Sequence, residues 1–184
     1  MTPGLWHRLR VEADTVFGSR DGSNGANQPI DDGLISRLEL ADRTMRETLR
    51  LHPAGVVSPR ESAVDVHVGG YVIPKGTLIM WSAHLAGRNS VAWADPLRYN
   101  PDRFANLTNE QKSVADQAWV PFGRGARNCI GFMLAQMELT IMIARLAQRL
   151  DIAPITDVVP QPVGLVVNRP LGGTPMRVNV RAST

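Results

Sequence analysis

The chain has 184 residues, 43% of them hydrophobic and 20% charged, with a formal net charge of +3. This composition is typical of a globular domain and excludes a disordered or fibrous protein. Basic residues are scattered among acidic ones, so we expect no nucleic-acid partner. No stretch is apolar and long enough for a signal segment or a membrane span, and we therefore expect a soluble, cytoplasmic protein.

Residues 1–52 are predicted to be helical. A first helix is expected over 5–17, where apolar residues recur at helical spacing and Gly18 follows as a typical C-terminal cap. A second helix is expected over 34–51. It would end before Pro53, because the residue preceding a proline disfavours the α region.

Glu47 and Arg50 are three residues apart on the second predicted helix. Their side chains therefore lie on one face and can pair. Taken alone, the pattern is typical of a solvated surface pair. Such a pair contributes roughly 0.3–0.5 kcal/mol and constrains little.

Residues 53–81 change to short β-like runs separated by turn residues. Gly69-Gly70 and Pro74-Lys75-Gly76 favour hairpin-like pairing into a small sheet. Arg60 lies beside the first run and, taken alone, is typical of an exposed arginine at a strand edge.

Residues 82–121 are expected to form a turn and meander region. We predict a short helix within 82–97, a turn over 99–104 and an irregular polar segment over 105–118.

The last part of the chain follows a glycine-rich loop at 122–131. A helix is predicted over 132–150. Residues 151–184 are predicted to form a terminal β-hairpin region, with strands at 163–167 and 176–180.

The glycine-rich loop holds Cys129, the only cysteine of the chain. A single cysteine cannot form an internal disulfide, which indicates a reducing compartment and a thiol kept for reactivity or metal binding. Three glycines allow the backbone to approach a flat ligand and to direct N–H groups at sulfur. The helix that follows would place the thiol near a helix N-terminus, which favours the thiolate.

Motif requirements exclude both kinds of nucleotide-binding loop and a zinc site here. A dinucleotide fingerprint needs a third glycine where Asn128 stands, and a phosphate loop needs Gly-Lys-Ser/Thr. A zinc site needs cysteines and histidines at close spacing, whereas all four histidines lie far from Cys129 in the sequence. Two alternatives stay open, a nucleophilic cysteine with a histidine partner and a thiolate ligand of haem iron. The histidines are His7, His52, His67 and His84.

The pattern Phe122-x-x-Gly125-x-Arg127-x-Cys129-x-Gly131 resembles the haem-binding signature of the cytochrome P-450 family of haem-thiolate monooxygenases, and all five fixed positions match. Three further stretches resemble family segments in the family's order. They are the Glu-x-x-Arg helix at Glu47-Thr48-Leu49-Arg50, a sheet segment at 69–76, and the Pro-Glu-Arg-Phe turn at Pro101-Asp102-Arg103-Phe104. The resemblance covers nearly the whole chain.

The resemblance implies haem b as the cofactor, with the Cys129 thiolate as the catalytic residue and axial ligand of the iron. Arg127 and Arg60 would bind haem propionates through charge-assisted hydrogen bonds. Phe122 would pack by the haem and shield the sulfur. The implied haem-binding residues are Cys129, Arg127, Phe122, Gly125, Gly131 and Arg60.

The resemblance also implies a buried structural ion cluster of Glu47, Arg50 and Arg103 beside the haem loop. Arg124 and Lys112 would lie on the face that meets an electron donor, with ordinary solvated charge as the alternative. Residues 54–58 and 162–164 correspond to substrate-facing stretches, with core packing as the alternative.

The fold implied by the resemblance is mainly α with small β-sheets, that is α+β. It is the C-terminal portion of the family fold, without the N-terminal half and the long distal helix. We therefore expect exposed apolar surface. Two departures from the family pattern stand out, namely Gly87 where a histidine is frequent and Asp102 where a glutamate is frequent.

The implied function is a monooxygenase, or its haem-binding part, that inserts one oxygen atom of O2 into a small apolar organic substrate. Electrons would come from NAD(P)H through a ferredoxin, a flavodoxin or a flavoprotein reductase. The alternative is a catalytically inactive, truncated fragment that binds haem weakly or not at all.

Overall fold

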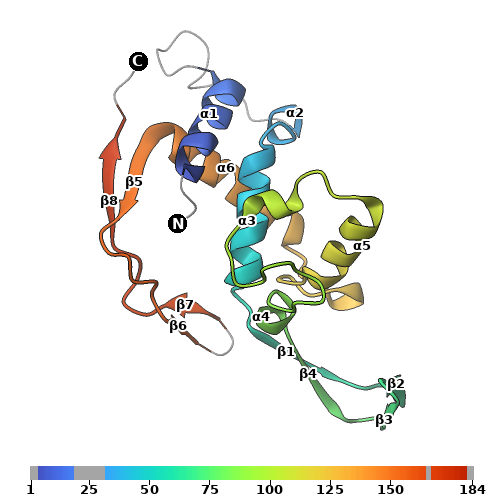
Figure 1. Cartoon of the computed structure of the whole chain (residues 1–184). Coiled ribbons are helices and arrows are strands. Elements are labelled where there is room, and N and C mark those ends of the chain that lie inside the picture. The colour runs from blue at the N-terminus through green and yellow to red at the C-terminus, as the bar shows by residue number, and fades with distance from the viewer. Residues whose placement is uncertain (1–3, 19–31, 165–166, 182–184) are drawn as a thin grey trace.

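The structure, a computed structural model, describes residues 4–18, 32–164 and 167–181 (Figure 1). Its α-helices are α1 Leu5–Phe17, α2 Asp32–Ile35, α3 Glu39–Leu51, α4 Ala83–Ala86, α5 Asn109–Ala118 and α6 Phe132–Arg149, and its short 3₁₀ helices are η1 Pro101–Phe104 and η2 Gly125–Arg127. Its strands are β1 Val57–Glu61, β2 Val66–Val68, β3 Tyr71–Ile73, β4 Leu78–Ser82, β5 Leu150–Pro154, β6 Pro162–Val163, β7 Arg169–Pro170 and β8 Met176–Val180. Helices combined with small two-stranded sheets confirm the predicted α+β class.

The main core lies between α1, α3 and α6. Leu5, Leu9 and Ala13 recur every four residues on α1, which places them on one helical face. In the same cluster, Ala144 and Ala147 of α6 are completely buried, and their small side chains let the neighbouring helices approach closely. The core thus holds α3, the helix of the predicted ion pair, against α6. Helix α6 directly follows the glycine-rich loop at 122–131, here called the cysteine loop.

The single helix predicted over 34–51 is wrong, because the structure divides it into α2 and α3 at residues 36–38. The carboxylate of Glu12 on α1 accepts hydrogen bonds from the backbone N–H groups of Leu40 (2.6 Å) and Ala41 (2.9 Å). In a continuous helix these N–H groups would bind the carbonyls four residues earlier. Glu12 therefore caps α3 from another helix, a contact that no local sequence pattern reveals.

Glu12→Ala is expected to lower the free energy of unfolding by about 1–2 kcal/mol, because two N–H groups at the start of α3 lose their acceptor. Urea denaturation followed by circular dichroism measures the change. The matched control is Glu39→Ala, which removes an exposed carboxylate from the first turn of the same helix. Equal losses in the two variants would show that the cap contributes nothing beyond its charge.

The strands of residues 57–82 form two antiparallel pairs instead of one small sheet. β2 and β3 pair across Gly69-Gly70, so the predicted hairpin is confirmed there. β1 instead pairs with β4, the strand after the hairpin. Figure 1 shows the β2–β3 hairpin projecting from the helices at the far end of the β1–β4 pair.

The irregular segment predicted over 105–118 is wrong for most of its length, because α5 spans Asn109–Ala118. The Thr108 side chain accepts a hydrogen bond from Gln111 N at 3.2 Å, and the Gln111 side chain accepts one from Thr108 N at 3.0 Å. This reciprocal capping box marks a helix start. The Thr-x-x-Gln signal is present in the sequence, but the helix buries only Ala115 and its apolar periodicity is weak.

The terminal hairpin predicted between 163–167 and 176–180 is also wrong. β8 pairs antiparallel with β5, the strand that directly continues α6, and β6 pairs with β7. Residues 165–166 of the predicted first strand lie outside the described residues. Contacts to α1 hold the β5–β8 pair, since Trp6 Nε1 donates to Leu150 O at 3.1 Å and Arg181 pairs with Asp14 at 3.2 Å.

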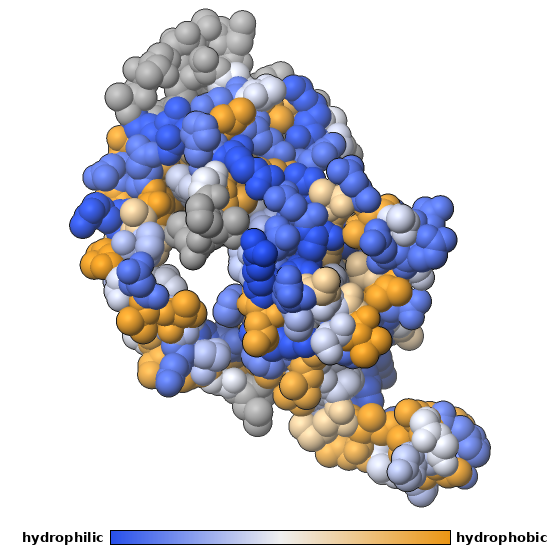
Figure 2. All heavy atoms as spheres, viewed as in Figure 1, coloured by the Kyte–Doolittle hydropathy of each residue, from blue (hydrophilic) through white to orange (hydrophobic). Residues whose placement is uncertain are grey.

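Large apolar side chains are exposed on several surfaces, as the sequence predicted. Figure 2 shows hydrophobic residues on the projecting hairpin, where Val68 and Val72 are each 55% exposed. At the cysteine loop, Ile130 is fully exposed and Met133 is 70% exposed. Within the described ranges, no helix is long and apolar enough to cross a bilayer.

Candidate functional site

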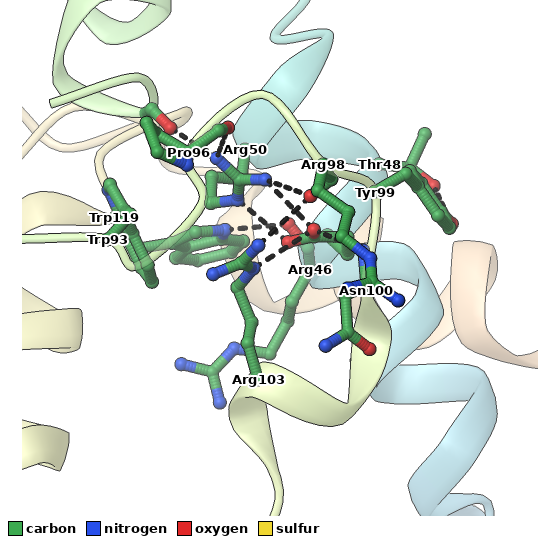
Figure 3. Close-up of polar contacts among 12 residues, drawn as sticks. Arg46, Thr48, Arg50, Trp93, Pro96, Arg98, Tyr99, Asn100, Arg103 and Trp119 are labelled. Carbon is green, nitrogen blue, oxygen red and sulfur yellow. Dashed lines mark hydrogen bonds and ion pairs between the residues drawn. The ribbon is translucent and has the colours of Figure 1, made fainter. Parts of the chain in front are cut away.

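The structure brings Glu47, Arg50 and Arg103 together in one buried cluster (Figure 3). The two oxygens of Glu47 accept hydrogen bonds from Arg50 Nε at 2.7 Å and Arg50 Nη2 at 2.9 Å. Arg103 Nε reaches the same carboxylate at 3.0 Å, and the backbone N–H of Asn100 reaches it at 2.7 Å. Glu47 is 0% exposed and Arg50 1%, so the interpretation as a solvated surface pair is wrong.

Two guanidinium groups share one carboxylate in this cluster, and backbone carbonyls offset the excess positive charge. Arg50 donates to the carbonyl oxygens of Gly87, Pro96 and Arg98. Arg103 donates to the carbonyls of Ala94, Asp95 and Arg98. The cluster thereby fastens the irregular segment 87–98 to α3, which gives it a structural role. Because Glu47 and Arg50 are buried, removal of one of them leaves buried polar groups unpaired.

Position 87 requires glycine because this segment lies very close to α3. A Cβ atom at this position would lie 2.1 Å from the carbonyl oxygen of Arg50. The backbone angle of Gly87 is an ordinary helical one, so space and not conformation excludes a side chain here. A histidine at this position would require the segment to lie farther from α3.

Two histidines lie beside the arginine cluster. Burial lowers the pKa of His52, and the charges of Arg88, His84 and Arg50 lower it further. Burial and Arg88 likewise lower the pKa of His84, whose Nδ1 lies 3.2 Å from Arg88 Nη1. Both imidazoles are therefore neutral at pH 7, and they add no positive charge beside Arg50.

Asp102, which stands where the family turn usually has glutamate, holds η1 to α1. Its two oxygens accept hydrogen bonds from Arg8 Nη1 at 2.9 Å and Arg8 Nη2 at 2.7 Å. This bidentate contact keeps the pKa of the Asp102 carboxyl below its usual value, with a smaller effect of Arg43.

Asp102→Asn is expected to destabilise the protein by up to about 1 kcal/mol at neutral pH, since both partners are 43% exposed and water screens the pair. The pKa of Asp102 is lower in the folded chain than in the unfolded one. The pair's contribution is therefore fully present above the ordinary carboxyl pKa of about 3.9 and is lost as the pH falls through the lower folded value. Urea midpoints of both proteins at about pH 7 and about pH 3 measure this. With Asp157→Asn, an exposed carboxylate, as control, a pH-independent difference for Asp102→Asn would contradict the assignment.

Cys129 is exposed at the surface of the loop, and its backbone is held on both sides. Its N–H donates to Phe122 O at 2.9 Å, and its carbonyl accepts from Phe132 N at 3.2 Å. Gly125 has a φ of +72°, a conformation that L side chains rarely adopt, and a Cβ on Gly131 would lie 3.9 Å from the cysteine sulfur. The loop thus presents the thiol at the surface, with glycine two residues after it.

The arginines of the loop have different surroundings. Arg127 is exposed and, within the part of the chain that the structure describes, has no hydrogen-bond or ion-pair partner. Arg124 donates to the carbonyl of Asp116 on α5 at 2.6 Å. Lys112 lies one turn before Asp116 on that helix and is exposed. Arg127 is therefore free to meet an anionic group, while Arg124 fastens the loop to α5.

Arg60 lies on the sheet that borders the cysteine loop. In the β1–β4 pair, Ser58 is opposite Trp81, so these two residues and Arg60 lie on the same face of the sheet. Trp81 reaches the loop, because a Cβ on Gly123 would lie 3.7 Å from its ring. Arg60 donates only to its neighbouring carbonyl, that of Pro59, among the contacts of the described residues. The sheet thus brings toward the loop a second guanidinium that has no carboxylate partner among the described residues.

The two predicted substrate-facing stretches are neighbours. Asn168 N donates to Ala54 O at 2.7 Å. Asn168 directly precedes β7, whose partner β6 spans Pro162–Val163. Residues 54–58 and 162–164 are therefore held close together by elements far apart in the sequence.

A cavity of about 480 Å³ lies beside the inner side of the loop. A second cavity, of about 530 Å³, lies between α3, η1 and α6 and shares Asp42 and Arg46 with the first. Burial raises the pKa of the Asp42 carboxyl, and Arg46 and Arg43 oppose the rise. Cys129 lines neither cavity. The first cavity is lined by Arg46, Asp116, Trp119, Phe122, Arg124 and Phe132 among others.

The alternatives that the sequence left open for Cys129 have different outcomes. None of the four histidines forms a hydrogen bond to Cys129 in the described ranges, so the histidine-activated nucleophile lacks its base. The residues that the structure describes contain no group of three or more His, Cys, Asp or Glu side chains that could hold a metal ion. The thiolate ligand of haem iron is the alternative that this geometry supports.

Comparisons with known proteins agree with this geometry. A family model described as Cytochrome P450 matches residues 1–174. The chain is 35% identical to an iridoid oxidase of Catharanthus roseus over 89% of this chain and 30% of that protein. It is 37% identical to a pentalenene oxygenase of Streptomyces avermitilis over 86% of this chain and 33% of that protein. The chain thus spans about a third of the length of these curated relatives.

Among solved structures, the chain matches a cyanobacterial protein described as retinoic acid bound CYP120A1. The TM-score is 0.79 at 23% sequence identity, over 96% of this chain and 39% of that one. This likeness shows the fold, which is the mixed helical and small-sheet architecture of haem-thiolate enzymes. The chain belongs to the cytochrome P450 family.

Members of this family use haem b, iron protoporphyrin IX, as their cofactor. The residues present fit that group. The exposed thiol is a suitable axial ligand, and the glycines around it leave room for a flat ring. Within the described part, Arg127 has no partner and Arg60 donates only to the Pro59 carbonyl, so both can donate to carboxylates.

Proposed function

We propose that this chain is the haem-binding part of a cytochrome P450 monooxygenase and that Cys129 is the axial thiolate ligand. The observation that carries the proposal is the exposed sulfur of a cysteine whose backbone is hydrogen-bonded on both sides, in a loop that contains Gly125 and Gly131. Bound haem supplies the activation of O2 and the insertion of one oxygen atom into an organic substrate.

The side chains around the thiol have separate roles in this proposal. Phe122 lies at the base of the loop and packs beside the bound haem. Arg127 and Arg60 orient the cofactor by binding its propionates, and Gly125 and Gly131 allow the close approach of the backbone. The cluster of Glu47, Arg50 and Arg103 holds the surrounding meander in place.

The substrate of this proposal is a small apolar organic molecule, held in part by residues 54–58 and 162–164. Support comes from the adjacency of these two stretches and from the relatives, which are named as an iridoid oxidase and a pentalenene oxygenase. Electrons derived from NAD(P)H arrive through a ferredoxin, a flavodoxin or a flavoprotein reductase. Exposed Arg124, which lines the cavity beside the loop, and exposed Lys112 on α5 suit an acidic donor protein.

Haem titration of the purified chain tests the proposal. The expected result is saturable binding and, after reduction under carbon monoxide, the red-shifted Soret band of thiolate ligation. A chain that binds haem without this band contradicts the role of Cys129, and a chain that binds none contradicts the proposal as a whole.

The second candidate is a catalytically inactive fragment that binds haem weakly or not at all. One observation favours it, namely that the described residues leave Cys129 and Ile130 exposed, so they do not exclude water from the thiol. The two candidates differ in haem dissociation. A haem that transfers within seconds to an excess of apomyoglobin would favour the second.

A further inference from the structure

The Trp119 ring contacts the phenylalanines at the two ends of the cysteine loop, Phe122 and Phe132. Among the aromatic contacts of the described residues, no other ring outside the loop contacts both. The Trp119 ring centroid lies 6.0 Å from that of Phe122 and 6.4 Å from that of Phe132. The two phenylalanines also contact each other edge to face at 5.2 Å. Phe122 begins the loop and Phe132 begins α6, so these three rings close the loop at its base.

The backbone of Cys129 is bonded to the same two phenylalanines. Its N–H donates to Phe122 O, and its C=O accepts from Phe132 N. A shift of either ring therefore moves one of the two hydrogen bonds that place the cysteine. Residues 124–130 of the loop are all exposed, and Arg124 ties them to α5 through the carbonyl of Asp116.

Trp119 itself is anchored to α3. Its indole Nε1 donates to the carbonyl oxygen of Arg46 at 2.9 Å, and its own N–H closes the last turn of α5 on Ala115 O at 2.8 Å. The Arg46 guanidinium lies 5.4 Å from the Trp119 ring centroid and 4.5 Å from that of Phe104. Figure 3 shows Trp119 and Arg46 beside the ion cluster, and Arg46 directly precedes Glu47 in α3.

We infer that Trp119 is a positioning residue for the thiolate. It is anchored to α3 and packs against the two phenylalanines, and these hold the backbone of Cys129. The inference deepens the proposed function, on which its relevance to haem ligation rests. The position of the loop, however, is a property of the chain alone and can be measured without haem.

The test compares Trp119 with Trp93, which has nearly the same surroundings. Trp93 Nε1 donates to Ala86 O at 3.0 Å, its ring lies 5.7 Å from that of Phe104, and Arg50 lies 5.4 Å from its centroid. Trp93 does not contact Phe122 or Phe132 in the aromatic contacts of the described residues. The variants are Trp119→Ala, Trp119→Phe and, as the matched control, Trp93→Phe.

The measurement is amide hydrogen exchange by NMR on the haem-free chain, with the rate of the Cys129 N–H divided by that of Met45 N–H in the core of α3. The ratio is expected to rise about tenfold in Trp119→Ala and about threefold in Trp119→Phe, which keeps the ring contacts but loses the donor. It should change less than about twofold in Trp93→Phe. An unchanged ratio in Trp119→Phe, or an equal rise in Trp93→Phe, overturns the inference even if Trp119→Ala does not fold.

A second readout uses haem-loaded protein. Trp119→Phe is expected to lower the fraction of the reduced carbon monoxide complex that shows the thiolate band, whereas Trp93→Phe is not. If the wild-type chain shows no such band, the proposed function fails, and the exchange ratios still decide the role of Trp119.

Discussion

Arg50→Ala is expected to lower the free energy of unfolding by about 3–5 kcal/mol, because it leaves Glu47 as a buried carboxylate that has lost its closest cationic partner. The carbonyls of Gly87 and Pro96 lose the hydrogen bonds from Arg50 in the same variant, whereas that of Arg98 keeps its bond from Arg103. A loss of this size is comparable to the whole stability of many domains, so most of the expressed variant should be insoluble and free of haem. The soluble fraction after expression and the urea midpoint of any soluble protein measure the effect.

Two further variants separate the cluster from a general effect of charge. Arg98→Ala removes an exposed guanidinium from the same meander, where only the backbone carbonyl of Arg98 takes part in the cluster, and should stay within about 0.5 kcal/mol of the wild type. Arg50→Lys keeps the charge, but an ammonium group cannot replace the planar fork that bridges Glu47 and three carbonyls. It should lie between the other two. Normal solubility and stability of Arg50→Ala would contradict the structural role of the cluster.

Cys129→Ala is expected to abolish the thiolate Soret band of the reduced carbon monoxide complex while leaving the haem-free chain as stable as the wild type. The thiol is exposed, and within the described ranges its side chain makes no hydrogen bond, so truncation should change the free energy of unfolding by less than about 0.5 kcal/mol. The loop stays in place because its hydrogen bonds to Phe122 and Phe132 use the backbone of residue 129. Absorption spectra and urea denaturation measure the two effects separately.

Ile130→Ala is the control for Cys129→Ala, since it truncates the fully exposed neighbour and leaves the thiol intact. It should retain the thiolate band. If Cys129→Ala and the wild type give the same spectrum, the ligand is another residue and the central assignment is wrong.

Prediction from sequence succeeded where the signal is local. The spacing of Leu5, Leu9 and Val16 identified α1, and the Gly69-Gly70 turn identified the β2–β3 hairpin. It failed where a distant residue decides the structure. Glu12 interrupts the predicted second helix by capping α3, and β1 and β5 pair with strands that follow much later in the chain.

The residues of the site show the same division. Cys129, its glycines and the Glu-x-x-Arg pair were recognisable because the family motifs are contiguous or nearly so. Three other residues were not recognisable, because each contacts a partner outside its own segment. Trp119 contacts the carbonyl of Arg46, Arg8 the carboxylate of Asp102, and Trp81 the backbone at Gly123. The capping box at Thr108 and Gln111 is different, since its signal is local and only weak periodicity hid the helix.

The sequence by itself determined the family, the cysteine and the local helices, since these depend on short-range patterns of side-chain type. The family resemblance implied that Glu47 and Arg50 are buried, but only the tertiary structure showed which groups surround them, because the carbonyls of the meander at 87–98 come from elsewhere in the chain. The tertiary structure also decided how Cys129 is held. The aromatic contacts of Trp119 and the sheet that carries Arg60 and Trp81 come from segments that meet the loop only in the folded chain.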